Sequence, residues 1–128
     1  MSEPLKIVVA DDEQDVRDYF CRMLPHLGHA VAGVASNGRE LIELCRDRRP
    51  DVIISDVRMP EMDGDVALRQ ICAEQPTPFI LVTAHSKSLE PVDGLFPGCR
   101  WLFLTKPIKR RDLQRAIESV SPRRQSLD

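Results

Sequence analysis

A chain of 128 residues, 42% hydrophobic and 30% charged, is long enough for one domain with a sizeable core. Its net charge of -2 gives no reason to expect nucleic-acid binding, and no apolar run approaches the roughly 20 residues that a membrane span needs. The N-terminus lacks the basic and apolar segments of a signal peptide, so we expect a cytoplasmic protein without a membrane partner.

Apolar runs alternate with amphipathic stretches along the chain. The runs predict short strands, mostly buried on both faces, at residues 7–10, 30–35, 52–54, 79–82 and 101–104. Apolar residues at helical spacing predict helices near residues 16–27, 38–48, 65–74 and 113–120. Prolines and glycines between residues 86 and 98 leave room for only a short helix.

Local signals mark the ends of these helices. Asp12 or a neighbour can cap the first helix, and Gly28 closes it. Asn37 followed by Glu40 resembles a capping box, and Pro50 stops the helix that it starts. Strands and helices that alternate five times predict an α/β fold, a doubly wound parallel sheet with helices on both faces and right-handed crossovers.

Four cysteines, Cys21, Cys45, Cys72 and Cys99, are widely and almost evenly spaced. No CxxC pair and no clustered histidine accompanies them. We interpret them as small hydrophobic residues and expect no disulfide and no zinc site.

Polar residues follow directly on the predicted strands. They are Asp11, Asp12, Asp56, Thr83 and Lys106. In a parallel sheet the C-terminal strand ends share one edge, so we expect these side chains to converge. Each has a plain structural reading, such as a helix cap, a strand threonine or a solvated lysine, but their joint placement argues against coincidence.

The convergence has a chemical meaning. Crowded carboxylates raise one another's pKa unless a cation lies among them, and Mg²⁺ suits oxygen ligands of this kind. Lys106 can pair with a phosphate or with Asp56, and Thr83 offers a hydroxyl donor. These groups suit the stabilisation of a phosphoryl group in transfer, with a carboxylate as its acceptor.

Four motifs in this order resemble the receiver domain of bacterial two-component response regulators. They are Val9–Glu13, Asp56–Pro60 with Asp63-Gly64, Val82–Ala84 and Leu104–Pro107. The resemblance covers roughly residues 5–120 and implies a (βα)₅ flavodoxin-like fold with a five-stranded sheet in the order 2-1-3-4-5. Residues 121–128 are then a C-terminal tail or the start of a linker.

The resemblance implies a role for each site residue. Asp56 would accept a phosphoryl group from a histidine kinase or a histidine phosphotransfer protein. Asp12 and Asp56 would bind Mg²⁺ directly, Asp11 would act through water, and Arg58 would offer its backbone carbonyl. The chain would then be a phosphoacceptor signalling module in a phosphorelay rather than an enzyme with turnover.

Switching is implied in the same way. Thr83 would bind the phosphoryl oxygen and Lys106 would pair with the phosphate, with a cis bond to Pro107. Phe103 falls where the family keeps an aromatic switch residue, although a core phenylalanine is an equal reading. An effector protein or an output domain missing from these residues would receive the signal, and a phosphorylation-dependent homodimer stays open.

Two basic residues lie two positions beyond the implied acceptor and hydroxyl. Arg58 and His85 could obstruct a water that attacks the aspartyl-phosphate, which predicts slow self-dephosphorylation. The alternative is that both are merely solvated side chains.

The chain departs from the family before its last strand. Cys99 and Arg100 stand where the family often has Gly-Ala, so we expect a shifted or irregular fourth helix and carry over no dimer mode. Leu95, Phe96 and Trp101 form either a partner surface or, in our interpretation, part of the core.

Two other functions stay open. A small Mg²⁺-dependent phosphohydrolase would use Asp56 as nucleophile, but the chain shows no dedicated general acid. A degenerate receiver would act only as a scaffold, against which the intact acids, Thr83 and Lys106 argue.

Overall fold

The computed structural model describes residues 4–84, 96 and 98–121. Its sheet has five parallel strands in the order β2-β1-β3-β4-β5, which confirms the expected order. The strands are β1 (Lys6–Ala10), β2 (Ala30–Ala35), β3 (Val52–Asp56), β4 (Phe79–Thr83) and β5 (Trp101–Thr105). The helices are α1 (Gln14–His26), α2 (Gly38–Arg48), α3 (Gly64–Glu74) and α4 (Arg110–Val120).

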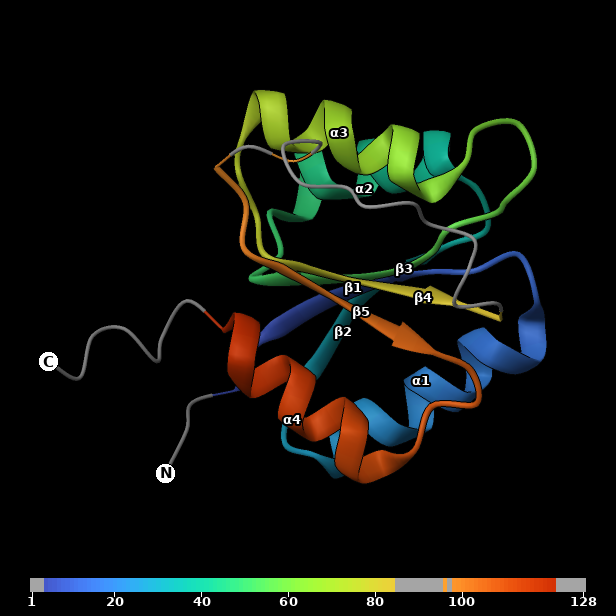
Figure 1. Cartoon of the computed structure of the whole chain (residues 1–128), viewed down its shortest axis with the longest axis vertical. Helices are drawn as coiled ribbons and strands as arrows, with labels where there is room; N and C mark the ends of the chain where they lie inside the picture. The colour runs from blue at the N-terminus through green and yellow to red at the C-terminus, as the bar shows by residue number, and fades with distance from the viewer. Residues whose placement is uncertain (1–3, 85–95, 97, 122–128) are drawn as a thin grey trace, which may run out of the picture.

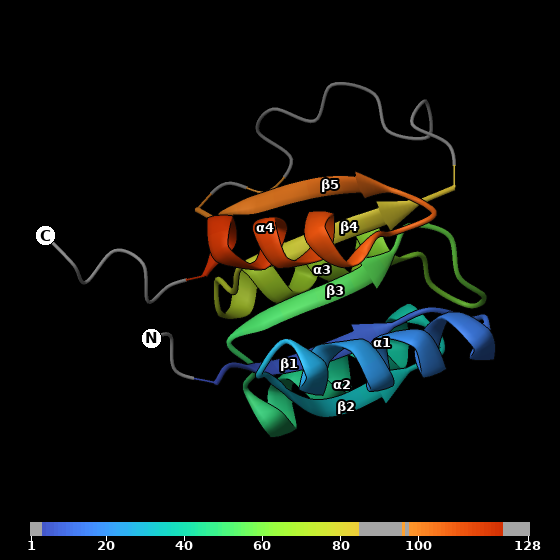
Figure 2. The same ribbon diagram turned by 90° about the horizontal axis from the view of Figure 1, so that it is seen from below.

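The helices form two layers around the sheet. Helices α2 and α3 cover one face, and α1 and α4 cover the other (Figures 1 and 2). The short helix expected between residues 86 and 98 falls mainly on residues 85–95 and 97, outside the described ones, so the label α4 belongs to the final helix. None of the helices that the structure describes is long and apolar enough to cross a membrane.

The central strands are buried on both faces, as their unalternated apolar runs predict. In β1, Val8 packs into the core under α2 and α3, whereas Ile7 and Val9 pack into the core under α1 and α4. Phe79 and Ile80 of β4 divide between the two cores in the same way. Three adjacent strands are therefore held rigidly from both sides, and their C-terminal ends are fixed relative to one another.

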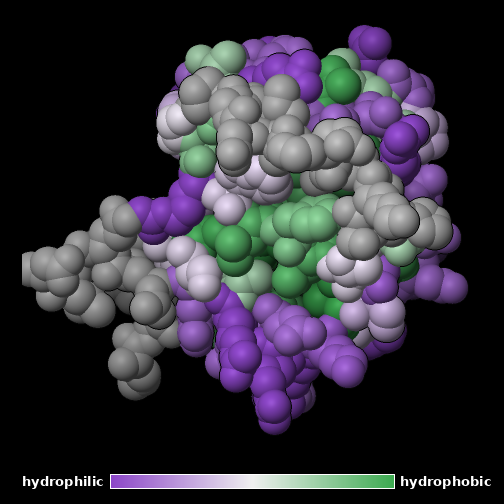
Figure 3. Space-filling model, viewed as in Figure 1, coloured by the Kyte–Doolittle hydropathy of each residue, from purple (hydrophilic) through white to green (hydrophobic). Residues whose placement is uncertain are grey.

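The edge strand β5 is less covered. Among the described strands it pairs with β4 alone, and Leu102 is exposed. In Figure 3 hydrophobic residues lie in the band between the two helix layers, on the face that carries β5. Phe96 is buried and Trp101 is partly buried against Phe79, so both belong to the core as expected, and Leu95 lies outside the described residues.

Two helix ends differ from expectation in detail. Asn37 accepts a hydrogen bond from the Glu40 amide at 2.8 Å, which confirms the cap, but the Glu40 carboxylate accepts from the Ser36 amide. Asp12 does not cap α1, which begins after Glu13 without a side-chain cap. The Asp11 carboxylate instead accepts from the Glu13 amide at 2.9 Å.

One expectation about the cysteines is wrong. The structure joins Cys72, in the last turn of α3, to Cys99, two residues before β5, by a disulfide. The residues are 27 positions apart, so their spacing carries no pairing signal. Pairing of β4 with β5 brings Cys99 back beside α3, with 6.4 Å between the two Cα atoms.

Candidate functional site

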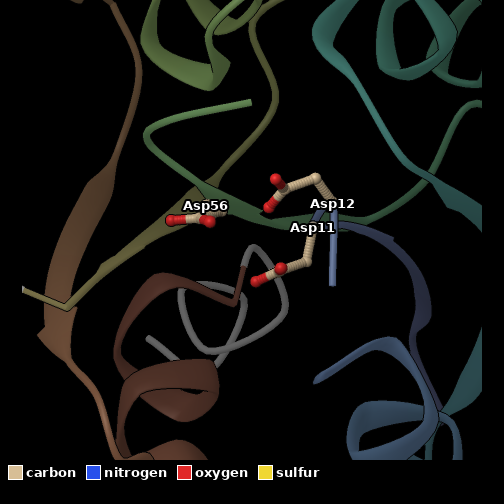
Figure 4. Close-up of side chains that lie close together, drawn as sticks. All are labelled: Asp11, Asp12 and Asp56. Atoms are coloured by element: carbon tan, nitrogen blue, oxygen red, sulfur yellow. The ribbon is translucent and has the colours of Figure 1, made fainter. Parts of the chain in front are cut away.

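Three carboxylates meet at the C-terminal edge of the sheet. Asp11 and Asp12 follow β1, and Asp56 is the last residue of β3, the strand paired with β1. One ligand oxygen from each lies within 4.8 Å of the other two. Figure 4 shows the three carboxyl groups turned toward a common space, as the parallel topology predicts.

Asp11 is almost fully buried, and both its carboxylate and its backbone carbonyl accept hydrogen bonds. One carboxylate oxygen accepts from the Glu13 amide, and the other accepts from Lys106 Nζ at 3.1 Å. Its backbone carbonyl accepts from the Arg17 guanidinium at 2.7 Å. Helix α1 and the end of β5 therefore hold Asp11 from both sides.

Lys106 is the cation of the site. Its ammonium lies 3.1 Å from Asp11, 3.5 Å from Asp56 and 3.8 Å from Glu13. Its backbone amide donates to the Thr83 carbonyl at 2.7 Å, which ties it to β4, and its bond to Pro107 is cis, as expected. Burial alone would lower the pKa of Lys106, but the hydrogen bond and charge of Asp11, with Asp56 and Glu13, raise it overall. Lys106 is therefore a firmly charged ammonium at neutral pH.

The pKa of the Asp56 carboxyl is raised by its surroundings. Burial is the largest cause and Asp11 the next, with Asp12 adding to them, and together they raise its pKa from 3.8 to about 6. Lys106 and a hydrogen bond from the Val57 amide at 2.8 Å oppose this rise. A cation beside Asp56 would thus relieve a repulsion that the fold imposes.

The loop after β3 supports Asp56 from behind. The Gly64 amide donates to the Val57 carbonyl at 2.7 Å, and the Asp63 carboxylate accepts from the Met59 amide at 3.0 Å. A Cβ on Gly64 would overlap the backbone carbonyl oxygen of Asp56. The glycine therefore permits the close approach that holds Asp56 in place.

The remaining predicted residues take different positions. Thr83 is buried at the end of β4, and Phe103 is partly buried on β5 against the core under α2 and α3. The Arg58 side chain is exposed on the loop after β3. His85 lies outside the described residues.

The motifs did not single out Arg17, Tyr19 and the packing role of Gly64. Tyr19 donates from its hydroxyl to the Ile108 carbonyl at 2.7 Å, two residues beyond Lys106. Its place on the apolar stripe of α1 gave no signal for this bond, because the partner is 89 residues away. Tyr19 thus fastens the segment after Lys106 to α1.

We expect Tyr19→Phe to lower the free energy of unfolding by about 1 kcal/mol, the net value of one hydrogen bond. The ring and its edge contact with Phe20 stay, so the effect isolates the hydroxyl. Thermal unfolding measures it as a decrease of roughly 3–5 °C in Tm. An unchanged Tm would mean that the bond to Ile108 does not hold the segment.

The donor set fits a hard divalent cation. Carboxylate oxygens from Asp11, Asp12 and Asp56 are the ligands that Mg²⁺ prefers, and one positive side chain does not balance three negative ones. Asp12 is exposed and gives access from solvent. The residues present could therefore hold Mg²⁺ at this edge.

A parallel five-stranded sheet in this order, with acids and a lysine at its C-terminal edge, defines a flavodoxin-like receiver fold. Residues 7–118 match the family described as response regulator receiver domain. The chain belongs to this family.

Relatives and solved structures agree with this assignment. The chain is 33% identical over 115 residues to the transcriptional regulatory protein PdtaR of Mycobacterium tuberculosis, covering 90% of this chain and 56% of the relative. It is 38% identical over 105 residues to a protein-glutamate methylesterase/protein-glutamine glutaminase of Archaeoglobus fulgidus, covering 80% and 30%. The chain thus spans about half or less of the length of these relatives.

Among structures, the receiver domain of NarL from M. tuberculosis is 32% identical, with a TM-score of 0.78 and coverage of 91% and 94%. The receiver domain of the sensor kinase PA1611 from Pseudomonas aeruginosa holds magnesium in its active-site cleft and is 27% identical, with a TM-score of 0.77 and coverage of 91% and 97%. A chain of the CheX–CheY complex from Borrelia burgdorferi, at 23% identity, a TM-score of 0.83 and coverage of 92% and 90%, shares the fold.

Proposed function

We propose that the chain is a phosphoacceptor receiver in two-component signalling, with Asp56 as the acceptor and residues 5–120 as the receiver domain. The observation that carries this proposal is the placement of Lys106 and the Asp11 and Asp12 carboxylates around a half-buried Asp56. Membership of the receiver family supports it.

An Asp56 carboxylate oxygen attacks the phosphorus of a phosphohistidine on a kinase or phosphotransfer protein. The P–N bond breaks, its electron pair returns to the imidazole nitrogen, and an acyl phosphate forms on Asp56. Mg²⁺, held by Asp12 and Asp56 with Asp11 and the Arg58 carbonyl, would neutralise charge on the phosphoryl oxygens. Lys106 already contacts Asp56 at 3.5 Å and supplies a second positive charge there.

Phosphorylation would shift the packing of the last two strands, β4 and β5. The phosphoryl group adds about two negative charges, which attract the Thr83 hydroxyl and the Lys106 ammonium. Thr83 and Phe103 lie on neighbouring strands, so movement of Thr83 would change the space open to the partly buried Phe103 ring. Phe103 has no hydroxyl, so its two positions would differ in packing rather than in hydrogen bonding.

A partner that presents phosphohistidine needs a surface beside Lys106. A groove of about 410 Å³ lies there, lined by Asp15 and Lys106 and by apolar side chains of α1 and of the segment after β5. Tyr19, Phe20 and Ile108 contribute to it. We assign this groove to the kinase or phosphotransfer protein, and the output to an effector protein or to an output domain.

We expect Arg58→Ala to shorten the lifetime of the aspartyl-phosphate by a factor of about three, because the exposed side chain no longer obstructs the attacking water. This factor corresponds to a decrease of less than about 1 kcal/mol in the activation free energy of hydrolysis. The decay of the phosphorylated chain by intact mass measures this rate. Arg69→Ala, another exposed arginine, is the control and should decay like the wild type. Equal lifetimes in all three chains would show that Arg58 is merely solvated. The same expectation for His85→Ala concerns a residue outside the described ones.

Incubation with acetyl phosphate and Mg²⁺, followed by intact-mass measurement, tests the proposal. We expect a stable adduct of one phosphoryl group, absent without Mg²⁺ and absent in Asp56→Asn. Asp47→Asn, which removes an exposed carboxylate of α2, should keep the adduct. Catalytic release of phosphate would indicate a hydrolase, and no adduct with no Mg²⁺ binding would indicate a scaffold, so either result overturns the proposal.

A further inference from the structure

The Cys72–Cys99 disulfide lies at the opposite edge of the sheet from the acidic site. Helix α3 runs from Gly64, beside Asp56, to Glu74, so Cys72 in its last turn lies near the start of β4. Cys99 precedes β5, which runs parallel to β4. The bond therefore fastens the N-terminal end of β5, the end farthest from Lys106, to α3.

The two residues of the disulfide differ in exposure. Cys72 is buried, with 7% of the residue exposed, whereas Cys99 is only partly buried. Access to Cys99 lets a thiolate from solvent attack its Sγ. A bond of this kind is open to reduction in the folded chain, unlike one sealed in the core.

The other two cysteines are not joined to each other or to the disulfide. Cys45 is buried, which raises the pKa of its thiol to about 12 and keeps it protonated. Cys21 is exposed on α1, and both are free thiols. The chain thus holds one disulfide together with two thiols that can serve as internal references.

The bond secures the start of the edge strand, which among the described residues is also held by strand pairing, ring contacts and one side-chain hydrogen bond. β5 pairs with one neighbour only, and its entrance is held by the Phe79 amide, which donates to the Arg100 carbonyl at 3.1 Å. The Phe96 ring contacts those of Phe79 and Trp101, with centroids 4.8 and 5.1 Å apart. Among the described residues, loss of the cross-link leaves this aromatic cluster, the pairing with β4 and the hydrogen bond from the Arg100 guanidinium to the Ser121 carbonyl at 3.3 Å to hold the start of β5.

We propose that Cys72 and Cys99 form a reversible thiol–disulfide site through which dithiol reductants control how firmly the edge strand β5 is held. A reductant thiolate attacks Cys99 Sγ and forms a mixed disulfide, while Cys72 leaves as a thiolate and takes a proton. The second reductant thiol then closes its own disulfide and releases Cys99 as a thiol. Two electrons and two protons pass from the dithiol to the protein.

The proposal that the Cys72–Cys99 disulfide forms and breaks reversibly rests in part on the proposed function. A receiver phosphorylated by a kinase works in a compartment where thiol reductants act, and disulfides there are mostly transient or redox-sensing. The test reads the sulfur chemistry and the strand directly. It needs no phosphorylation, so it can fail while the phosphoacceptor role stands, and the reverse.

Thiol counting of the full chain is the first measurement. The chain is equilibrated in buffers of oxidised and reduced dithiothreitol, then unfolded and alkylated for intact mass. We expect two labelled thiols in the oxidised chain, Cys21 and Cys45, and four after reduction under native conditions. Four thiols under every buffer, or a bond that reduces only after unfolding, overturns the proposal.

Hydrogen exchange and thermal unfolding are the second measurement. Reduction should speed amide exchange in residues 100–103 about tenfold or more and lower Tm by about 10 °C, because a cross-link closing a loop of this size is lost. Cys99→Ser, at the more exposed position, should exchange rapidly in both buffers, and Cys21→Ser should keep the wild-type response. Exchange in β5 that ignores the redox buffer overturns the proposal.

Discussion

The Asp56→Asn variant is expected to be more stable than the wild-type chain at neutral pH, by up to about 3 kcal/mol. The pKa of Asp56 rises from 3.8 to about 6 in the folded chain, and each unit is worth about 1.36 kcal/mol. Asparagine keeps the shape and can still accept from the Val57 amide. It removes the charge that burial, Asp11 and Asp12 make unfavourable.

Proton linkage gives the direction in which the stability of the wild-type chain changes with pH. The folded state binds a proton on Asp56 more tightly than the unfolded state, so this group is stabilising below pH 3.8. That contribution is lost as pH rises to about 6, and above this pH the folded chain carries the full cost of the charge. The wild type should therefore lose stability between these pH values relative to Asp56→Asn.

Thermal unfolding across this pH range measures the difference, with an expected gain of roughly 10 °C in Tm at pH 7 for the variant. Asp47→Asn, at an exposed carboxylate, is the control and should follow the wild type. Mg²⁺ should raise Tm in the wild type more than in Asp56→Asn, because it relieves the same repulsion. A variant that is less stable than the wild type at pH 7 would contradict the electrostatic account of the site.

Gly64→Ala is expected to destabilise the chain by about 3 kcal/mol or more. The added Cβ would overlap the Asp56 carbonyl oxygen and lie 2.5 Å from the Ser55 hydroxyl oxygen. The first of these is backbone, so no rotamer change relieves the overlap. Either α3 or the end of β3 must move, and both position Asp56.

Denaturant unfolding measures the loss, and Gly33→Ala is the matched control. The atoms nearest to its Cβ would all belong to the flexible Leu44 side chain, the closest at 2.9 Å, so a smaller loss is expected. Gly64→Ala should also slow adduct formation by acetyl phosphate, because Asp56 shifts. Equal stability of the two variants would show that the approach of α3 to Asp56 is not tight.

The strand ends could be predicted from the sequence because the required information is local. An unalternated apolar run implies burial on both faces, and parallel pairing places the residue after each run at one edge. Asp11, Asp56 and Lys106 meet there, as this reasoning expects. The Asn37 cap was likewise predictable because its partner lies within one helical turn.

Contacts between distant segments were decided only by the tertiary structure. Which carboxylate Lys106 approaches most closely, Asp11 rather than Asp56, depends on how β5 ends beside β1 and β3. The Tyr19 bond to Ile108 and the disulfide of Cys72 with Cys99 join residues far apart in the chain. No spacing in the sequence encodes these pairs.

The sequence by itself therefore determined the order of strands and helices and the chemistry gathered at one sheet edge. The tertiary structure decided which groups touch, how far burial raises the pKa of Asp56, and that the edge strand is tied to α3 by sulfur. The physical reason is that periodicity reports which face of an element is buried. Distances and desolvation arise only once the elements have packed together.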